Sequence, residues 1–472
     1  MELKKWCNKS EELRSEISDE YFKMQVGLEY SKEKIEKLQK TNSELAKTFL
    51  KYYTEPKDLY YDSISSQLSE KLSKLMIKFN EYRKKKVSIK INGKDINWTS
   101  WRQYVVNAKD QDRKYVFDQF IEKTKYITPI IEETFDTYRK VYKSHNVDVL
   151  EPYFYQHKTT YNKLKNVVDE LGSSLKKTFQ KQFNNYSNEL NNRNAEYYDD
   201  FYYMRNAVFS KIKTKNKFNS LESIKNRMKI LGFNIEKIYV DYKDRKDKYS
   251  SPFCESVKIP NDVRVSYKDE DFLNTLGSIY HEFGHAVHFT SIDKNLEYWK
   301  KYYCSEALCE TFSTFFEELI SNKDYLTKEL KFKEPEAEDI VKRSKFNELY
   351  AMTFYSANSI FKMEYWKQNM TMREANEYYN KMIKKYMGME IDGRYWQLHH
   401  ILPESVLYVP SYLLARIRAS ELKKKLEQMQ GNEWYNNKKS GEWLRSLMKP
   451  GTESRIASFD NINPEVLIKE LK

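Results

Sequence analysis

The stretch that decides the fold runs from Leu276 to Phe289 and reads LGSIYHEFGHAVHF. It contains the pattern HExxH on a segment whose apolar spacing predicts a helix, which puts His281 and His285 one turn apart. Two imidazoles at that spacing can bind one metal ion, and Glu282, about 100° further round the helix, can address a water on the metal. Composition alone would give HExxH in fewer than about 2% of such chains, yet an ordinary surface helix remains the alternative.

A second predicted helix, Ser305–Ile320, offers a third metal ligand. Glu306, Glu310, Ser313 and Glu317 line one face of it, in a segment that is otherwise apolar. A row of carboxylates among apolar residues is costly unless something cationic faces it. Glu310 is therefore the candidate third ligand, and a salt-bridged helix face is the alternative.

Other arrangements of zinc ligands can be tested against the residues after HExxH. A metzincin needs Gly at 288 and His at 291, and the chain has His288 and Ser291 there, which excludes that class. The remaining interpretation is a His281, His285, Glu310 site with an open position for water. His288 lies on the same helical stripe as His281 and is interpreted as a packed or orienting residue rather than a ligand.

Composition narrows the fold class and the partners. Only 11 Gly and 10 Pro in 472 residues argue against an all-β fold, and no GxGxxG or Walker loop is present, so the prediction is a mainly α protein. The net charge of +13 is spread along the chain, which favours a solvated surface over a specific nucleic-acid partner. No apolar run is long enough for a membrane span, and the N-terminus lacks the apolar core of a signal peptide, so we expect a cytoplasmic protein without membrane contact.

Cysteine usage agrees with a reducing compartment. The four cysteines, Cys7, Cys254, Cys304 and Cys309, do not form a disulfide framework in a chain of this length. Cys304 and Cys309 are five residues apart, which is not a CxxC pair, so we interpret them as buried thiols.

Helical patterning covers most of the chain. It is predicted for residues 8–52 and 63–84 and again over 101–218, with breaks near Pro129, Pro152 and Gly172. Asn92-Gly93 between two alternating segments predicts a hairpin over 87–98, and short β-branched runs in 234–267 predict two or three strands. Helices are expected from Phe272 to the end. We divide the chain into an N-terminal helical region, 1–230, and a catalytic region, 231–472.

The two motifs together resemble those of the thimet oligopeptidase / oligoendopeptidase F family of gluzincin metallopeptidases. HEFGHAVH carries the family's glycine before the second histidine and a further histidine, His288, and Glu310–Glu317 resembles its E-x-x-S-x-x-x-E. Pro252–Ser266 resembles the strand segment at the border of the cleft, and His399-His400 with Tyr408-Val-Pro-Ser-Tyr412 resembles its H…Y…Y element. The resemblance covers about 235–420. The second candidate is the related helical carboxypeptidase family with HExxH, whose motif usually lacks a histidine at the position of His288.

The resemblance implies a two-lobed helical zincin with a deep substrate channel and a small β-element beside the active-site helix. It implies one Zn²⁺ per chain, held by His281, His285 and Glu310, and cleavage of short unfolded oligopeptides with zinc-bound water as nucleophile. Glu282 would be the general base, and the candidates for contact with the scissile carbonyl are His400, Tyr412, Tyr408 and, last, His399. The alternatives are an HExxH metallocarboxypeptidase of related fold and an inactive helical binding protein. Endo- or carboxypeptidase action and oligomeric state stay open.

Overall fold

A computed structural model describes most of the chain after residue 55. The described residues are 56–91, 93–98, 100–191, 193–199, 220–243, 245, 252–268, 272–399 and 401–472. The helix predicted over residues 8–52 and the catalytic candidate His400 lie outside these ranges.

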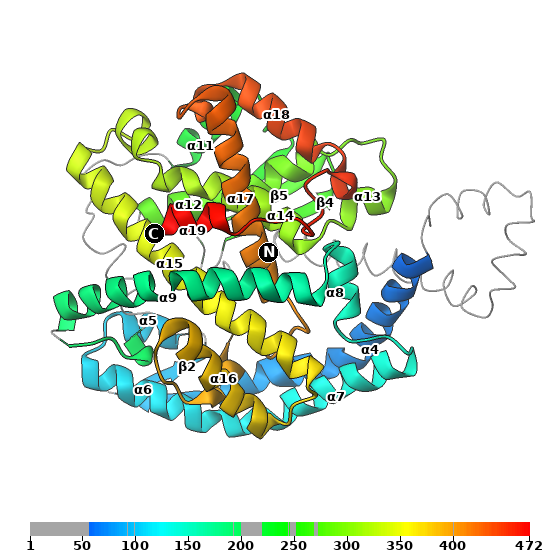
Figure 1. Cartoon of the computed structure of the whole chain (residues 1–472), viewed down its shortest axis with the longest axis vertical. Helices are drawn as coiled ribbons and strands as arrows, with labels where there is room; N and C mark the ends of the chain where they lie inside the picture. Colours follow the sequence, from blue (N-terminus) through cyan, green and yellow to red (C-terminus); the bar gives the residue numbers. More distant parts are fainter. Residues whose placement is uncertain are drawn as a thin grey trace, which may run out of the picture. The chain divides into compact units, whose positions relative to one another are not determined.

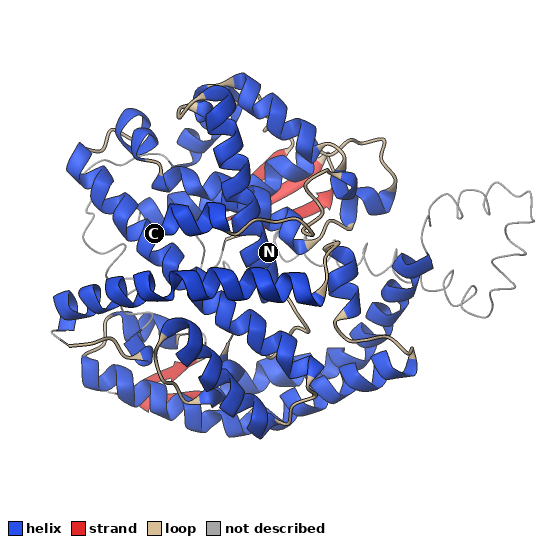
Figure 2. Ribbon diagram, in the orientation of Figure 1, coloured by secondary structure: helices blue, strands red, loops and turns tan. Residues whose placement is uncertain are grey.

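Helices make up most of the described chain, which confirms the predicted mainly α class (Figures 1 and 2). In the N-terminal half the α-helices are α4 (Pro56–Lys85), α5 (Trp101–Val106), α6 (Asp110–Lys123), α7 (Thr128–Ser144), α8 (Glu151–Gln156), α9 (Tyr161–Asn191) and α11 (Ser220–Ile230). In the C-terminal half they are α12 (Phe272–Ser291), α13 (Tyr298–Tyr302), α14 (Glu306–Glu317), α15 (Glu334–Lys367), α16 (Met372–Met387), α17 (Val409–Gln430), α18 (Lys438–Met448) and α19 (Glu465–Leu471). No helix among the described residues is both long and apolar enough to cross a membrane.

The predicted hairpin is confirmed. Strand β1 (Ser88–Ile91) pairs antiparallel with β2 (Lys94–Asn97), and Ile91 lies opposite Lys94, so a two-residue turn joins them. Gly93 ends that turn at φ +77°, the left-handed region that glycine adopts without a steric penalty.

Three further strands form a small sheet, in agreement with the two or three predicted for 234–267. Its order is β3 (Ile238–Asp241), β5 (Asp262–Ser266), β4 (Phe253–Lys258), with β3 parallel and β4 antiparallel to the central strand. Val263 and Val265 of β5 are buried in the same apolar core as Ile279 and Phe283 of α12. The sheet therefore packs on the helix that carries HExxH, and β4 forms one of its edges.

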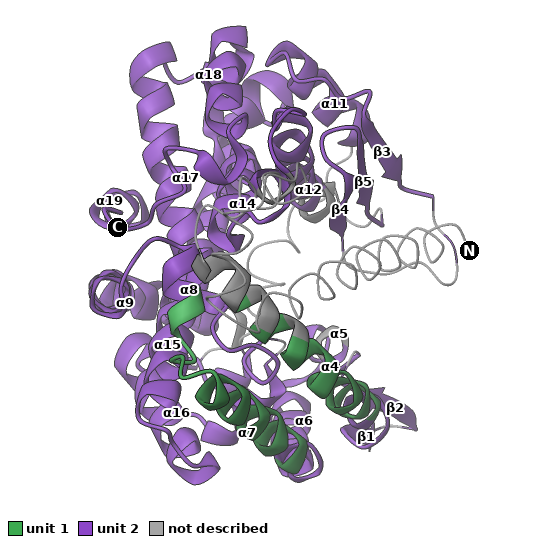
Figure 3. Ribbon diagram, turned by 90° about the vertical axis from the view of Figure 1, so that its right-hand side faces the viewer, with its two compact units in different colours: residues 1–81, 129–152 green, residues 82–128, 153–472 purple. Residues whose placement is uncertain are grey.

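The chain forms two compact units, which Figure 3 colours separately. The first comprises residues 1–81 and 129–152, and within it the Tyr61 hydroxyl donates a hydrogen bond of 2.6 Å to Glu151 Oε1. The second comprises residues 82–128 and 153–472 and holds every described site residue that the sequence predicts. The predicted division into an N-terminal helical region, 1–230, and a catalytic region, 231–472, concerns function rather than compactness and stays a prediction.

Gly172 does not interrupt a helix as predicted but lies inside α9. A Cβ atom at this position would lie 2.6 Å from Ser356 Cβ on α15 and 2.6 Å from Tyr386 Cδ1 on α16. The prediction was wrong because Gly172 allows three helices to pack closely. In a sequence, a glycine that serves packing looks the same as one that ends a helix.

Candidate metal centre

Two helices, α12 and α14, pack closely and carry the predicted ligands. The first contributes His281 and His285, the second Glu310. The helices approach at Gly284, where an added Cβ would lie 2.5 Å from Ser313 Cα and 2.6 Å from the Phe312 carbonyl oxygen. Only glycine permits that backbone contact, so the residue between the two histidines sets the distance between the helices.

The three predicted ligands converge on one point. Glu310 Oε2 lies 3.3 Å from His281 Nε2 and 3.7 Å from His285 Nε2. Among the described His, Cys, Asp and Glu side chains, these are the only three or more whose ligand atoms all lie within 4.8 Å of one another. Two ligands bound tetrahedrally at about 2.0–2.2 Å would be separated by about 3.3–3.6 Å, which is close to the two separations from Glu310 Oε2.

Three neighbouring side chains orient these ligands. Glu317 Oε2 lies 2.9 Å from His281 Nδ1, the ring nitrogen that faces away from Glu310. The Ser313 hydroxyl donates to Glu310 Oε2 at 3.1 Å, and the Tyr408 hydroxyl donates to Glu310 Oε1 at 3.3 Å. Such support fixes the tautomer of a ligating histidine and the direction of a ligating carboxylate.

The electrostatics of the cluster favour a positive charge between the ligands. Burial raises the pKa of Glu310, but contacts with His281 and His285 outweigh it and lower the pKa to about 2. Burial lowers the pKa of His281, whereas Glu310 and Glu317 raise it well above its usual range. For His285, burial dominates and lowers the pKa to about 3. A carboxylate beside a neutral imidazole is the donor set that a divalent cation completes.

Glu282 is placed beside the ligands without belonging to them. Its side chain is only 8% exposed, and burial, followed by the charges of Glu310 and Glu317, raises its pKa to about 7 despite the opposing charge of His281. Burial first, and then the charge of Glu282, raises the pKa of Cys254 on edge strand β4, which packs against α12. A carboxylate that titrates near neutral pH suits an exchange of protons with substrate.

His288 packs behind the centre. It is fully buried, its ring lies 4.6 Å from that of Phe312, and it is not one of the three converging side chains. This placement matches the interpretation of His288 as a packed residue.

The segment 393–412 reaches the centre through Tyr408. Residues Gly393–Leu398 form a 3₁₀ helix, and Tyr408 is the N-cap residue of α17. Its ring meets that of Tyr412 edge-on at 5.3 Å, so the predicted first-turn arrangement of the two tyrosines is present. Tyr412 in turn stacks on Tyr355 at 5.2 Å.

His399 is directed into the protein. It is 3% exposed, and its Nδ1 accepts hydrogen bonds from the backbone N–H groups of Ile401 at 3.1 Å and Leu402 at 3.3 Å. Its role in this structure is to hold the loop that leads to α17.

A buried polar cluster that the sequence did not reveal supports the start of α17. His157 Nδ1 donates to the Tyr153 carbonyl at 2.8 Å, and the Ser411 hydroxyl lies 3.3 Å from His157 Nε2 and 3.0 Å from the Tyr153 hydroxyl. Burial lowers the pKa of His157 to about 4, so the ring is neutral. Tyr153 and His157 are four residues apart, but Ser411 lies more than 250 residues further along the chain, and no spacing rule connects it with them.

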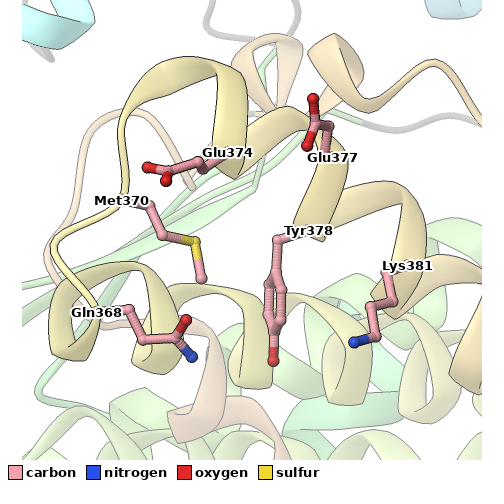
Figure 4. A pocket seen from close by; sticks show the side chains of 6 residues that line it. All are labelled: Gln368, Met370, Glu374, Glu377, Tyr378 and Lys381. Atoms are coloured by element: carbon pink, nitrogen blue, oxygen red, sulfur yellow. The ribbon is translucent and has the colours of Figure 1, made fainter.

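A pocket lies between the turn that follows α15 and the first half of α16, and it shares no residue with this centre (Figure 4). It is lined by Gln368, Met370, Glu374, Glu377, Tyr378 and Lys381, which include none of the predicted ligands.

Solved structures share this fold. The chain has a TM-score of 0.62 and 18% identity with PZ peptidase A in complex with an inhibitor, covering 90% of this chain and 78% of that one. With a Bacillus anthracis protein assigned as an oligoendopeptidase F, the TM-score is 0.58 and the sequence identity 15%. That match covers 96% of this chain and 83% of the other. With the M32 carboxypeptidase from Deinococcus radiodurans R1, the TM-score is 0.56 and the sequence identity 14%. That match covers 89% of this chain and 84% of the other. No curated protein matches the chain.

The helical fold and the converging His, His and Glu side chains agree with a metallopeptidase. Residues 10–357 match the carboxypeptidase Taq (M32) metallopeptidase family. That match spans most of the sequence, so the chain belongs to this family.

The finer prediction, membership of the thimet oligopeptidase / oligoendopeptidase F family, is not confirmed. The match is to the carboxypeptidase family that was the second candidate. HExxH and the helix of Glu310 supply metal ligands, which an oligoendopeptidase and a carboxypeptidase of this fold would both need. These motifs therefore do not distinguish the two families. The family match also covers residues 10–230, where the sequence has helical patterning but no catalytic motif.

Proposed function

We propose that the protein is a zinc-dependent peptidase acting on short, unfolded peptides. The observation that carries the proposal is the convergence of His281 Nε2, His285 Nε2 and Glu310 Oε2 beside Glu282. Two imidazoles and a carboxylate are the ligand set of catalytic zinc in several peptidases. Residues 231–472 would thus form the catalytic region.

Zinc in this position would lower the pKa of a bound water toward about 7 and polarise the substrate carbonyl. Glu282 would accept a proton during attack and return it to the leaving amine, a role that suits a pKa of about 7. Glu317, Ser313 and Tyr408 would keep His281 and Glu310 directed at the ion. His400 stays a candidate for contact with the carbonyl oxygen.

The substrate would be an extended peptide. β4 is an edge strand packed on α12, and an edge strand offers backbone groups to which an extended chain can add as a further strand. A stably folded domain cannot supply such a strand without local unfolding. Family membership favours removal of C-terminal residues, and oligoendopeptidase action is the second candidate because the fold is shared with the Bacillus anthracis protein assigned as an oligoendopeptidase F.

One experiment separates these possibilities. Purified protein is analysed for zinc and incubated with an unfolded peptide and its C-terminally amidated twin, with and without a chelator, and the products are identified by mass spectrometry. A carboxypeptidase shortens the free peptide from its C-terminus and leaves the amidated twin intact, whereas an oligoendopeptidase cuts both internally. Absence of zinc after reconstitution would overturn the proposal, and one bound zinc without cleavage would indicate a binding protein.

A further inference from the structure

Two side chains of α15 anchor the loop that precedes α17, residues 401–407, which we call the α17 loop. The Lys362 ammonium donates a hydrogen bond of 3.0 Å to the Leu402 carbonyl, and Trp366 Nε1 donates one of 2.8 Å to the Val406 carbonyl. The two donors are four residues apart on one helix and therefore share a face of it. That face of α15 thus holds the α17 loop at two points, four residues apart.

Further contacts fix the middle of the α17 loop. Arg83, in the last turn of α4, forms an ion pair with Glu404, and both residues belong to the second compact unit. Within the loop, the Ile401 carbonyl accepts hydrogen bonds from the backbone N–H groups of Glu404 at 3.0 Å and Ser405 at 3.1 Å. The loop therefore has a defined path, although it belongs to no helix or strand.

Lys362 is the costly member of this set of anchors. It is only 1% exposed, and its ammonium lies 5.4 Å from the ring centre of Tyr365 and 5.1 Å from that of Trp366. Taking an ammonium group out of water costs free energy, which the two aromatic rings and the carbonyl of the loop offset in part. A methionine would fill the same space on the helix without that cost. Helix packing alone therefore does not explain a lysine here, whereas its hold on the α17 loop does.

The α17 loop ends at a residue of the metal centre. Tyr408 follows the loop directly and is the N-cap residue of α17. Its hydroxyl donates to Glu310 Oε1 at 3.3 Å, on the oxygen that does not face the two histidines. Because Tyr408 lies at the junction of loop and helix, its backbone position depends on the path of the loop as well as on α17.

We infer that Lys362 is a positioning residue of the metal centre. By holding the Leu402 carbonyl it fixes the α17 loop, and the loop keeps the Tyr408 hydroxyl directed at Glu310. Trp366 has the same function at the other end of the loop. The effect on catalysis rests on the proposed zinc peptidase function, whereas the anchoring of the loop does not.

The anchoring is tested by amide hydrogen exchange on the full-length protein. Lys362→Met removes the ammonium and keeps an unbranched side chain, and the backbone N–H groups of residues 401–405 should then exchange about tenfold faster, because a hydrogen bond from a charged donor is lost. Lys367→Met is the matched control on the same helix: this lysine is exposed, and its ammonium lies 3.9 Å from the ring centre of Tyr161. It should leave exchange in the loop unchanged. Unchanged exchange in Lys362→Met would overturn the inference.

Peptide kinetics of the zinc-loaded proteins then test whether the loop acts through Tyr408. Lys362→Met should lower kcat about tenfold with little change in KM, the lower end of the effect of disturbing a ligand's support. In a Tyr408→Phe background the same substitution should change kcat less than about twofold, because the hydroxyl that it positions is already absent. A merely structural role would lower kcat by the same factor in both backgrounds, and that result would refute the positioning.

A second variant covers the case in which Lys362→Met folds poorly. Trp366→Phe removes only the indole N–H group that donates to the Val406 carbonyl, and it is taken through the same exchange and kinetic measurements with the same expected results. A parent protein that binds zinc but cuts no peptide would fail the proposed function. The exchange measurement would still decide whether α15 anchors the α17 loop.

Discussion

The two-helix centre, α12 with α14, and the segment 393–412 both supply predicted site residues, but they are built differently. In the two-helix centre each ligand lies on a regular helix, so the spacing of His281 and His285 determines their separation. In the segment 393–412 a 3₁₀ helix, a loop and the first turn of α17 follow one another. There the position of Tyr408 depends on tertiary contacts such as that with Glu310.

The difference teaches which residues a motif can identify. Helical periodicity places Glu317 and Ser313 on the same face as Glu310, and the structure directs both at the ligands. In the second segment the sequence ranked Tyr412 ahead of Tyr408 for contact with the scissile carbonyl, and that ranking stays a prediction. Tyr408 contacts a predicted metal ligand, Glu310. Tyr412 packs against Tyr355 instead.

The largest effect is expected within the two-helix centre. Glu282→Gln should retain one zinc and bind peptide but lose about 10²–10⁴ in kcat, because an amide cannot accept a proton. Glu310→Ala, the matched variant, should lose zinc itself. Metal analysis and steady-state kinetics distinguish the two. Near wild-type turnover by Glu282→Gln would show that another group is the base.

Variants of Tyr408 and Tyr412 test how much the segment 393–412 contributes compared with the two-helix centre. Tyr408→Phe removes the hydroxyl that donates to Glu310 Oε1, and we expect kcat to fall about 10–100-fold with folding unchanged. Tyr412→Phe keeps the ring that stacks on Tyr355 and should change kcat only a few-fold. Peptide kinetics and zinc content are measured for both. A larger loss for Tyr412→Phe would restore the order that the sequence suggested.

The third prediction concerns support of a ligand within the two-helix centre. Glu317→Ala removes the partner of His281 Nδ1 and should weaken zinc binding about 10–100-fold. Glu317→Gln retains a neutral hydrogen-bond acceptor and should lose less zinc affinity than Glu317→Ala. Competition with a zinc-binding dye measures both affinities. Equal affinity for wild type and Glu317→Ala would mean that the 2.9 Å contact has no part in holding the ion.

Much of this architecture could be predicted because it is local. The Asn92-Gly93 hairpin, the strands of 234–267 and the two ligand helices each follow from a short pattern. What could not be predicted involves residues far apart in sequence: the packing role of Gly172, and the contacts of Ser411 with Tyr153 and His157. Family assignment also depended on the whole chain, since the motif residues are compatible with two families.

The smallest expected effect tests the packing beneath the two-helix centre. Gly284→Ala would place a Cβ atom 2.5 Å from Ser313 Cα and 2.6 Å from the Phe312 carbonyl oxygen, both of them backbone atoms of α14. These atoms cannot move without shifting the helix that carries Glu310. We expect unfolding free energy to fall by about 1–3 kcal/mol, the usual cost of overpacking.

Gly277→Ala on the same helix is the matched control for that change. Its added Cβ would meet only the side chain of Ile320, at 2.8 Å, and the end of an isoleucine side chain can rotate away. Alanine also favours a helix by about 1 kcal/mol over glycine, so this variant should be close to wild type in stability. The unfolding free energies of both variants are measured with denaturant on the metal-free proteins, so that zinc binding does not contribute to the difference. If both variants were equally stable, the close approach at Gly284 would not be what sets the distance between His285 and Glu310.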